Sequence, residues 1–395
     1  MVDRARVRAA TNLLTGAVFA GLMAMPALDS MLGLDRTPPP QEKRKLAPRP
    51  ELPRSLAAAG DLPASFDAYL NDHFGFRSFL VRLHARAAVL WLGVAPGPNV
   101  EVMVGRHGWL FYTGDRSLPF VEGTAPFTDE ELQRWTVVLR QRSEWLARRG
   151  ARYLVVFAPG APSIYPEHLP GWVRPSPHGT RLDQLLTALK AAPDVAAVDL
   201  RPALRDAKEW ATVYPRTGTH WNLVGGWVAY SAIMTSLSHW FPAARPAPFS
   251  DFNLAWGRSH GGDLATMAGI EGMVSEPIPW LAPKGGWQAK TVPSPEYGAM
   301  RQWPHLEEPV VTVRPGAPIP TAVVFRDSFS MAVAPFLSED LGRAVYVWIH
   351  DFEPAVIVRE KPALVIQEYA ERLLSVVSPE NPPALALDEV NRPHS

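Results

Sequence analysis

The chain has 395 residues, 47% of them hydrophobic and 20% charged, and its 39 basic and 39 acidic side chains give a net charge of zero. This composition is typical of a globular protein with one large domain or two ordinary ones, and the balanced charge offers no strong field to attract nucleic acid. There is no cysteine, which excludes thiol nucleophiles, thiolate metal ligands and disulfide bonds and fits either side of a bacterial membrane.

An apolar stretch near the N-terminus predicts a membrane span. Residues 9–28 are long enough to cross a bilayer as a helix, and no small-x-small cleavage motif precedes Asp29. Arg4, Arg6 and Arg8 precede the apolar stretch and favour a cytoplasmic N-terminus. The basic cluster at 43–45, on the far side of the stretch, argues against that orientation. We predict a signal anchor over 1–35, with a cleaved signal or a buried soluble helix as alternatives, and then a Pro-rich tether over 36–60.

From residue 61 onward, helical and strand patterns alternate without a break in composition. Helical spacing is found at 62–91 (interrupted at Gly75), 128–149, 181–190, 223–240 and 329–337. Short apolar runs typical of buried strands are found at 153–158, 195–200, 321–325, 343–349 and 363–367, whereas 241–320 is mostly loop-like, with short strands as an alternative within it. This alternation predicts a three-layer α/β fold with a mostly parallel sheet over 61–378, followed by a loose tail over 379–395.

The segment 321–330 has the form of an apolar strand that turns into a helix. Functional residues of parallel sheets collect at such strand ends, and the turn delivers Ser328 to the start of the predicted helix. Backbone amides there can stabilise an oxyanion when the hydroxyl attacks an ester. The structural alternative is that Ser328 only caps the helix.

A second segment, 214–222, is a polar loop that leads into an apolar helix. His220 lies in it between Thr219 and Trp221, and among the eleven histidines it has the most site-like surroundings. A serine hydroxyl attacks poorly without a base, so His220 is our candidate to activate Ser328. The alternative is an ordinary surface histidine.

Several separate blocks, in a shared order and spacing, are similar to a known family. The chain resembles the AlgJ/AlgX family of alginate O-acetyltransferases, whose domain is similar to SGNH hydrolases. The resemblance covers most of 62–375 and rests on these blocks: Asp72–Arg77, Val104–Tyr112, Ser163–Pro170, Val198–Leu200, the Thr-His-Trp-Asn motif that ends at Asn222, Gly262–Leu264, Asp327–Phe329 and Gln367–Arg372.

The resemblance implies a serine nucleophile, a histidine base and an aspartate two residues before that histidine. By position these fall on Ser328, His220 and Gly218, so the carboxylate that normally orients the imidazole is missing. One interpretation is that another strand-end acid orients His220, and a second is a Ser–His dyad oriented by a backbone carbonyl. The third is a slow or inactive enzyme retained as a binding module. The candidate acids are Asp199, Asp327 and Glu368.

Arg326 is a second departure from the pattern of the related proteins, because SGNH proteins have glycine before the Asp-Ser pair. Its guanidinium either adds a cationic donor near the oxyanion or pairs with Asp327 or a helix acid. The residues that we predict to support the site are Asp327, Arg326, Trp221, Tyr165, Asp199 and Glu368.

The residues and the resemblance together predict an O-acetyltransferase that modifies an extracytoplasmic polysaccharide through an acyl-Ser328 intermediate. The resemblance implies a separate integral membrane acyltransferase as the acetyl donor partner, and a periplasmic location with the anchor in the inner membrane. We expect no cofactor and no metal, because no histidine spacing places two ligands on one face and no Gly-rich phosphate loop is present. The alternatives are a polysaccharide acetyl esterase and a non-catalytic glycan-binding or scaffold subunit of an exopolysaccharide secretion complex.

Overall fold

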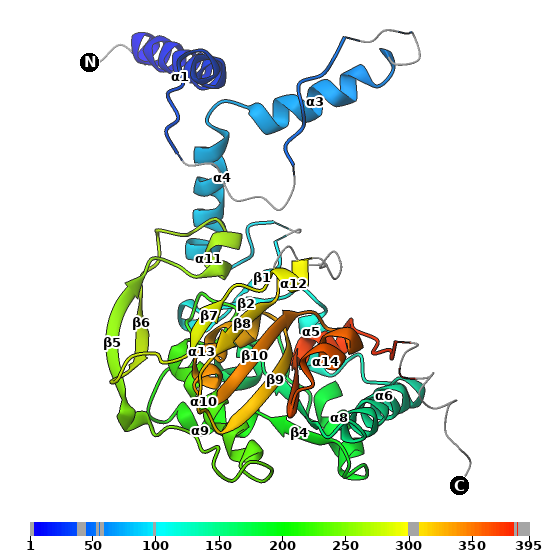
Figure 1. The fold of residues 1–395 in the computed structure, drawn as a ribbon. Coiled ribbons are helices and arrows are strands. Elements are labelled where there is room, and N and C mark those ends of the chain that lie inside the picture. Colours follow the sequence, from blue (N-terminus) through cyan, green and yellow to red (C-terminus); the bar gives the residue numbers. More distant parts are fainter. Residues whose placement is uncertain are drawn as a thin grey trace. The chain divides into compact units, whose positions relative to one another are not determined.

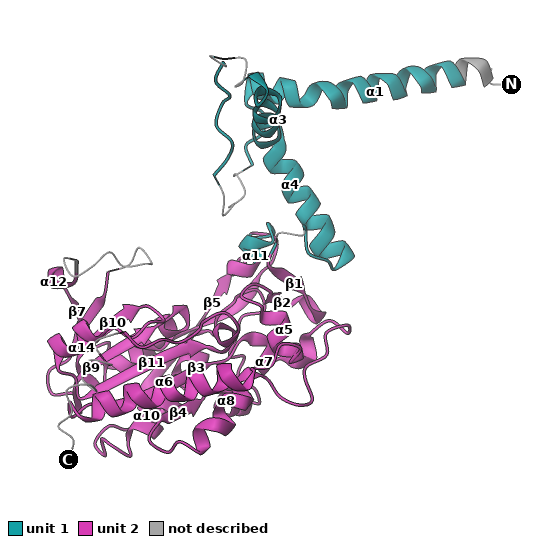
Figure 2. Ribbon diagram, turned by 90° about the vertical axis from the view of Figure 1, so that its right-hand side faces the viewer, with its two compact units in different colours: residues 1–100, 265–271 teal, residues 101–264, 272–395 magenta. Residues whose placement is uncertain are grey.

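The computed structural model describes residues 4–37, 45–52, 55, 59–97, 100–298, 308–382 and 385. It divides into two compact units, the first made of Met1–Val100 with Ala265–Glu271 and the second of Glu101–Leu264 with Gly272–Ser395 (Figure 2). We expected the globular domain to begin at residue 61. In the structure, residues 61–100 group instead with the N-terminal helix.

The first unit is helical. Helix α1 (Arg4–Leu32) contains a stretch, Arg8–Leu32, that is long and apolar enough to cross a membrane and is not buried in the protein. Helices α3 (Leu62–His73) and α4 (Arg77–Arg86) follow, and α4 continues into the π-helical turn η1 (Ala87–Leu92). The interruption expected at Gly75 therefore lies between α3 and α4.

The second unit is built on a seven-stranded sheet with the order β4-β3-β11-β9-β10-β8-β7. The strands from β4 to β10 in that order run parallel, as predicted, whereas β8 is antiparallel to β10 and to β7. The bounds are β3 (Arg152–Ala158), β4 (Ala196–Asp199), β7 (Lys290–Val292), β8 (Val310–Val313), β9 (Ile319–Arg326), β10 (Leu341–Trp348) and β11 (Leu364–Ala370). The two antiparallel strands lie in the region that we expected to be mostly loop.

Helices cover the sheet in two groups, which completes the predicted three-layer α/β fold (Figure 1). One group contains α6 (Asp129–Ala147), α8 (Arg181–Lys190) and α14 (Pro354–Glu360). The other contains α9 (Arg201–Ala207), α10 (Leu223–Leu237) and α13 (Ala334–Ser338). Helix α6 begins with a reciprocal capping box between Thr128 and Glu131, which supplies partners to backbone N–H groups that the first turn leaves unpaired.

Two small antiparallel pairs and several short helices complete the unit. The pairs are β1 (Val102–Val104) with β2 (Leu110–Tyr112), and β5 (Phe252–Ser259) with β6 (Glu276–Pro283). The short helices are η2 (Arg106–Gly108), α5 (Ser117–Glu122), α7 (Ala161–Ile164), η3 (Pro166–His168), η4 (Phe249–Asp251), α11 (Asp263–Met267), α12 (Pro295–Gly298), η5 (Ser328–Ala332) and η6 (Glu371–Ser375).

The core is the sheet with its flanking apolar helix faces. Leu154, Val155 and Phe157 of β3 have no exposed surface, as expected for a strand covered on both faces. The segment after residue 378 is not entirely loose. Arg142 donates to the side chain of Asn381 at 2.9 Å and to the carbonyl oxygen of Glu380 at 2.6 Å, so the start of the predicted tail is docked on α6.

Parallel strands end at one edge of the sheet, and this edge gathers the polar residues of the unit. Strand β9 ends at Arg326 and β11 at Ala370, directly before Asp327 and Glu371 respectively. Because neighbouring parallel strands end side by side, residues that are far apart in the sequence meet there.

Candidate active site

The turn that carries Ser328 is held by the carboxylate before it. Asp327 is the N-cap of η5, and its Oδ1 accepts a hydrogen bond from the backbone N–H of Phe329 at 2.8 Å. Its Oδ2 accepts from the N–H of Ala370 at 2.7 Å. The buried Asp327 therefore ties the turn to the end of β11 and leaves the Ser328 side chain half-exposed at the sheet edge.

His220 is positioned by the start of α10. Asn222 caps this helix by accepting hydrogen bonds from the N–H groups of Val224 and Gly225, each at 3.0 Å. The Trp221 indole N–H donates to the carbonyl oxygen of Phe329 at 3.0 Å, which joins the histidine loop to the serine turn. As a result, Nε2 of His220 lies 2.7 Å from Oγ of Ser328.

The carboxylate that faces the other ring nitrogen belongs to Asp263. Its Oδ2 lies 3.6 Å from Nδ1 of His220 and also accepts a hydrogen bond from the Thr219 hydroxyl. Its Oδ1 accepts from the Thr219 N–H at 2.7 Å. The distance of 3.6 Å exceeds a hydrogen bond but suits an ion pair with the imidazolium, and such contacts are often longer in enzymes without substrate.

A carboxylate thus approaches the imidazole from a different loop than the one that contains Gly218. A Cβ at position 218 would lie 3.6 Å from Oδ1 of Asp263 and only 2.6 Å from Cγ of Pro215. At Gly262, a Cβ would come within 2.6 Å of the carbonyl oxygen of Thr217, so a side chain there would push the Asp263 loop away. The chain therefore presents its acid from the start of α11.

The three acids that we proposed from the sequence as partners of His220 have other contacts. Asp199 receives hydrogen bonds from Arg201 Nε at 2.9 Å and Nη2 at 2.9 Å. Asp327 binds the two backbone N–H groups described above. Glu368 is buried next to Asp327, and burial together with the negative charge of Asp327 raises its pKa well above the usual value, which keeps its carboxyl neutral. These contacts do not involve His220, whereas Asp263 lies within ion-pair distance of it.

Burial lowers the pKa of His220, and the negative charge of Asp263 opposes that effect. The imidazole is therefore neutral at neutral pH. With Nδ1–H toward Asp263, its Nε2 is free to accept the proton of Ser328. Serine, imidazole and carboxylate stand in the order that nucleophilic catalysis requires.

Tyr165 and Arg326 stabilise the surroundings of the site. The Tyr165 hydroxyl accepts a hydrogen bond from the Val213 N–H at 3.0 Å, in the loop that leads to His220. The buried Arg326 stacks on the Trp348 ring, with 4.4 Å from its guanidinium carbon to the ring centroid, and donates to the carbonyl oxygen of Asp327 at 3.3 Å. It also lines a cavity of about 450 Å³ together with Met331 and Tyr346.

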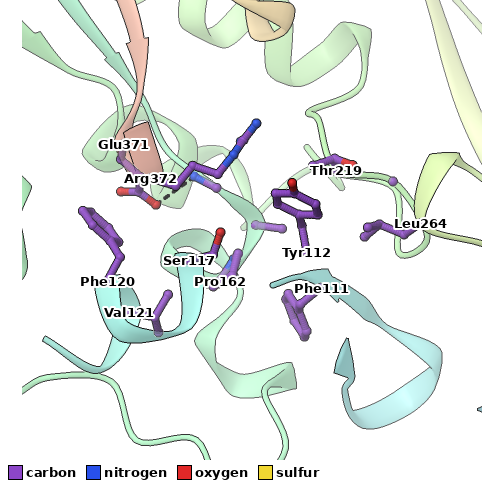
Figure 3. Close-up of a pocket in the computed structure, with 13 residues that line it drawn as sticks. Phe111, Tyr112, Ser117, Phe120, Val121, Pro162, Thr219, Leu264, Glu371 and Arg372 are labelled. Carbon is purple, nitrogen blue, oxygen red and sulfur yellow. Dashed lines mark hydrogen bonds between the residues drawn. The ribbon is translucent and has the colours of Figure 1, made fainter. Parts of the chain in front are cut away.

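A small cavity of about 30 Å³ lies beside the histidine loop (Figure 3). Its lining includes Thr219, Leu264, Tyr112, Glu371 and Arg372. Arg372 pairs with Asp115 at 3.0 Å, and its guanidinium carbon lies 5.2 Å from the ring centroid of Tyr112 and 5.5 Å from that of Phe329.

Burial raises the pKa of Glu371 to about 7. Sequence reasoning assigned no role to Tyr112 or Asp263 and gave the segment Gln367–Arg372 only a supporting one, although all lie in blocks that resemble the family. Among the described residues, no three His, Asp or Glu side chains are grouped as metal ligands.

The comparisons identify the family. Residues 102–299 match the family described as "SGNH hydrolase-like domain, acetyltransferase AlgX", and the chain belongs to that family. The matched range includes His220 and Asp263 and ends before Ser328.

A curated relative, "Probable alginate O-acetylase AlgJ" of Pseudomonas aeruginosa, is 27% identical over 221 residues, which cover 56% of this chain and 54% of that protein. The protein of the same name from Azotobacter vinelandii is 23% identical, with 68% and 64% covered. The chain thus spans about half to two thirds of the length of these relatives.

The solved structure of Bacillus cereus PatB1 supports the same fold. Bacillus cereus PatB1 superposes with a TM-score of 0.52 at 16% identity, covering 70% of this chain and 98% of that one. The O-acetyltransferase domain of Pseudomonas putida AlgJ has a TM-score of 0.49 at 21% identity, covering 74% and 99%. The predicted SGNH-like α/β fold is confirmed.

Proposed function

We propose that this protein is a serine-dependent O-acetyltransferase that acts on the hydroxyl groups of a polysaccharide. The observation that carries the proposal is the distance of 2.7 Å between Ser328 Oγ and His220 Nε2, with Asp263 behind the imidazole. A serine that only capped a helix would have no need of a neutral histidine within hydrogen-bond distance.

The reaction has two half-reactions. In the first, Ser328 Oγ attacks the acetyl carbonyl carbon while His220 Nε2 takes the hydroxyl proton, and the same proton then passes to the departing donor group. In the second, His220 removes the proton of an acceptor hydroxyl, which attacks the acyl-serine carbonyl. Collapse of that intermediate returns the proton to Ser328 and releases the acetylated acceptor.

The substrate and the location are inferred from the family and from α1. Relatives named alginate O-acetylase support a polysaccharide acceptor, and the unburied apolar stretch Arg8–Leu32 supports an anchor in the inner membrane with the second unit in the periplasm. An anchored enzyme of this kind receives acetyl groups from an integral membrane acyltransferase, which is the partner that the resemblance implies.

The proposal is tested by following acetyl transfer from a chromogenic acetyl ester to an added polysaccharide. Ser328→Ala removes the nucleophile, so both ester cleavage and acceptor acetylation fall by at least about 10³-fold. The matched control is Ser231→Ala in α10, whose Oγ is buried without a hydrogen-bond partner among the described residues. Full activity in Ser328→Ala would exclude the serine mechanism, and an inactive wild type would favour the scaffold alternative.

A second candidate, acetyl esterase, is favoured by solvent access. The His220 side chain is 33% exposed and Ser328 is partly exposed, so water has access to the acyl-serine carbonyl. Mass analysis of the polysaccharide separates the two functions, because a transferase adds acetyl groups to the acceptor and an esterase only removes them.

A further inference from the structure

Exposed apolar side chains gather on α3 and α4. Helix α3 buries none of its residues, and its large apolar side chains share one face while Asp67, Asn71 and Asp72 lie on the other. Six side chains near the junction of the two helices are each more than two fifths exposed, and we call them the corner patch: Phe66, Leu70, Phe74, Phe79, Leu80 and Leu83. A cluster of exposed large apolar side chains on two consecutive helices is a candidate interaction site.

The corner between α3 and α4 is fastened to the last turns of α1. Asp29 of α1 accepts a hydrogen bond from the N–H of Phe76 at 2.8 Å. Asp35, just after α1, accepts from the N–H of Phe79 at 3.2 Å and donates its own N–H to Asp29 at 2.6 Å. A further bond at 2.7 Å joins the Ala47 N–H to Asp72 of α3.

The backbone conformation at Gly75 and Phe76 allows the close approach of this corner to α1. Gly75 sits so close to α1 that a Cβ would collide with the carbonyl oxygen of Pro26. Phe76 adopts a left-handed conformation with φ of 60°, which is costly for a residue other than glycine and turns its N–H toward Asp29. The corner and the end of α1 are therefore one folded element (Figure 2).

This attachment decides what covers the patch. If α1 spans the bilayer, as in the proposed function on which this inference rests, its last turn emerges at the outer interface. The α3–α4 corner, whose backbone N–H groups are bonded to Asp29 and Asp35, then lies at the level of the lipid headgroups, where aromatic and leucine side chains are stabilised. We propose that the corner patch is a membrane-interfacial element that docks into the outer leaflet of the same bilayer that α1 crosses.

The absence of cysteine makes the proposal directly testable on the full chain. Single-cysteine variants Leu70→Cys and Phe79→Cys carry a nitroxide, and the protein is reconstituted into phosphatidylethanolamine–phosphatidylglycerol nanodiscs. Collision with oxygen, which concentrates in lipid, is compared with collision with a water-soluble nickel chelate. Val137→Cys on α6, which replaces a side chain exposed to 40%, is the solvent control, and Phe19→Cys in α1 is the span reference.

Docking predicts an oxygen-to-nickel accessibility ratio at positions 70 and 79 about threefold or more above that at position 137. A ratio equal to that of the control overturns the proposal. Protection from both reagents also overturns it, because it means that a second copy or another protein covers the patch. If position 19 shows no lipid signature, the anchor itself is wrong, which separates failure of the proposed function from failure of this inference.

The attachment is tested by Asp29→Ala in the Phe79→Cys background. Removing the acceptor of the Phe76 and Asp35 N–H groups releases the corner, and the ratio at position 79 is expected to fall at least about twofold. The matched change Asp67→Ala removes an exposed acid from the polar face of α3 and leaves the ratio unchanged. An equal response to both substitutions contradicts the role of Asp29.

Discussion

Carboxylates lie on two sides of the Ser328–His220 pair, and they differ mainly in their exposure to solvent. Asp263 is about half exposed and faces an imidazole, whereas Asp327 and Glu368 are buried beneath the serine turn. Both carboxylate oxygens of Asp327 accept hydrogen bonds from backbone N–H groups. Glu368 is neutral because burial raises its pKa. The comparison shows that Asp263 is within ion-pair distance of the imidazole, whereas the buried Asp327 holds the serine turn through its two hydrogen bonds.

The largest expected effect is that of Asp263→Ala. Loss of the carboxylate leaves the His220 tautomer undefined and the imidazolium unsupported, so kcat for acetyl transfer falls by about 10²–10⁴-fold while KM changes little. Steady-state kinetics with the chromogenic ester measure this. The control is Asp199→Ala, which removes the partner of Arg201 and should leave kcat within about threefold of wild type. A larger loss for Asp199 than for Asp263 would reverse the assignment.

The variant Gly218→Asp also tests whether Asp263 is the acid that supports His220. Gly218→Asp places a second carboxylate close to Asp263, and its Cβ also crowds Pro215. We therefore expect Gly218→Asp to lower kcat by about tenfold instead of raising it, because like charges repel and the loop shifts. A gain in kcat would mean that the family's usual position still serves this chain better than Asp263.

A smaller effect, on stability, follows from Asp327→Asn. The amide cannot accept from both Phe329 and Ala370, so one buried N–H loses its partner and the free energy of unfolding falls by about 1–3 kcal/mol. Denaturant unfolding of the full chain in detergent measures the change. The exposed Asp251→Asn is the control, with no expected loss. An unchanged midpoint in Asp327→Asn would show that the turn does not depend on this tie.

Glu368→Gln tests the neutral state of the buried acid. A carboxyl whose pKa is raised on folding stabilises the protein below its unfolded pKa, and that contribution is lost as pH rises through the folded pKa. Glutamine does not titrate, so the difference in unfolding free energy between pH 5 and pH 8 should be smaller in the variant. Part of the difference remains, because Glu371 has a pKa of about 7. An identical pH dependence would mean that Glu368 is ionised in the folded protein.

The smallest effect is on the pH profile of the reaction. Burial lowers the pKa of His220 below 6.5, so kcat falls on the acid side only below that pH, where the imidazole becomes protonated and can no longer act as a base. Asp263→Asn removes the charge that raises this pKa, and the acid limb of its residual activity should move to lower pH. An acid limb that does not move would show that Asp263 does not affect the pKa of His220.

The sequence alone was sufficient for the features that depend on local pattern. Apolar runs such as 153–158 predicted the buried parallel strands, the strand-to-helix turn placed Ser328 at the sheet edge, and the polar loop before an apolar helix identified His220. The long apolar helix α1 and the interruption at Gly75 could also be predicted from the sequence. Hydrophobicity and the helix-breaking effect of glycine both depend on only a few neighbouring residues.

Only the tertiary structure brought Asp263 close to His220. Asp263 lies 44 residues after Thr219, in a region without helical or strand periodicity, and its loop reaches the site because Gly218 and Gly262 leave room for the approach. The pairing of β7 with β8 and the attachment of Gly75–Phe76 to α1 could not be predicted for the same reason. Contacts between distant segments depend on the packing of the whole chain, and no pattern within one segment encodes them.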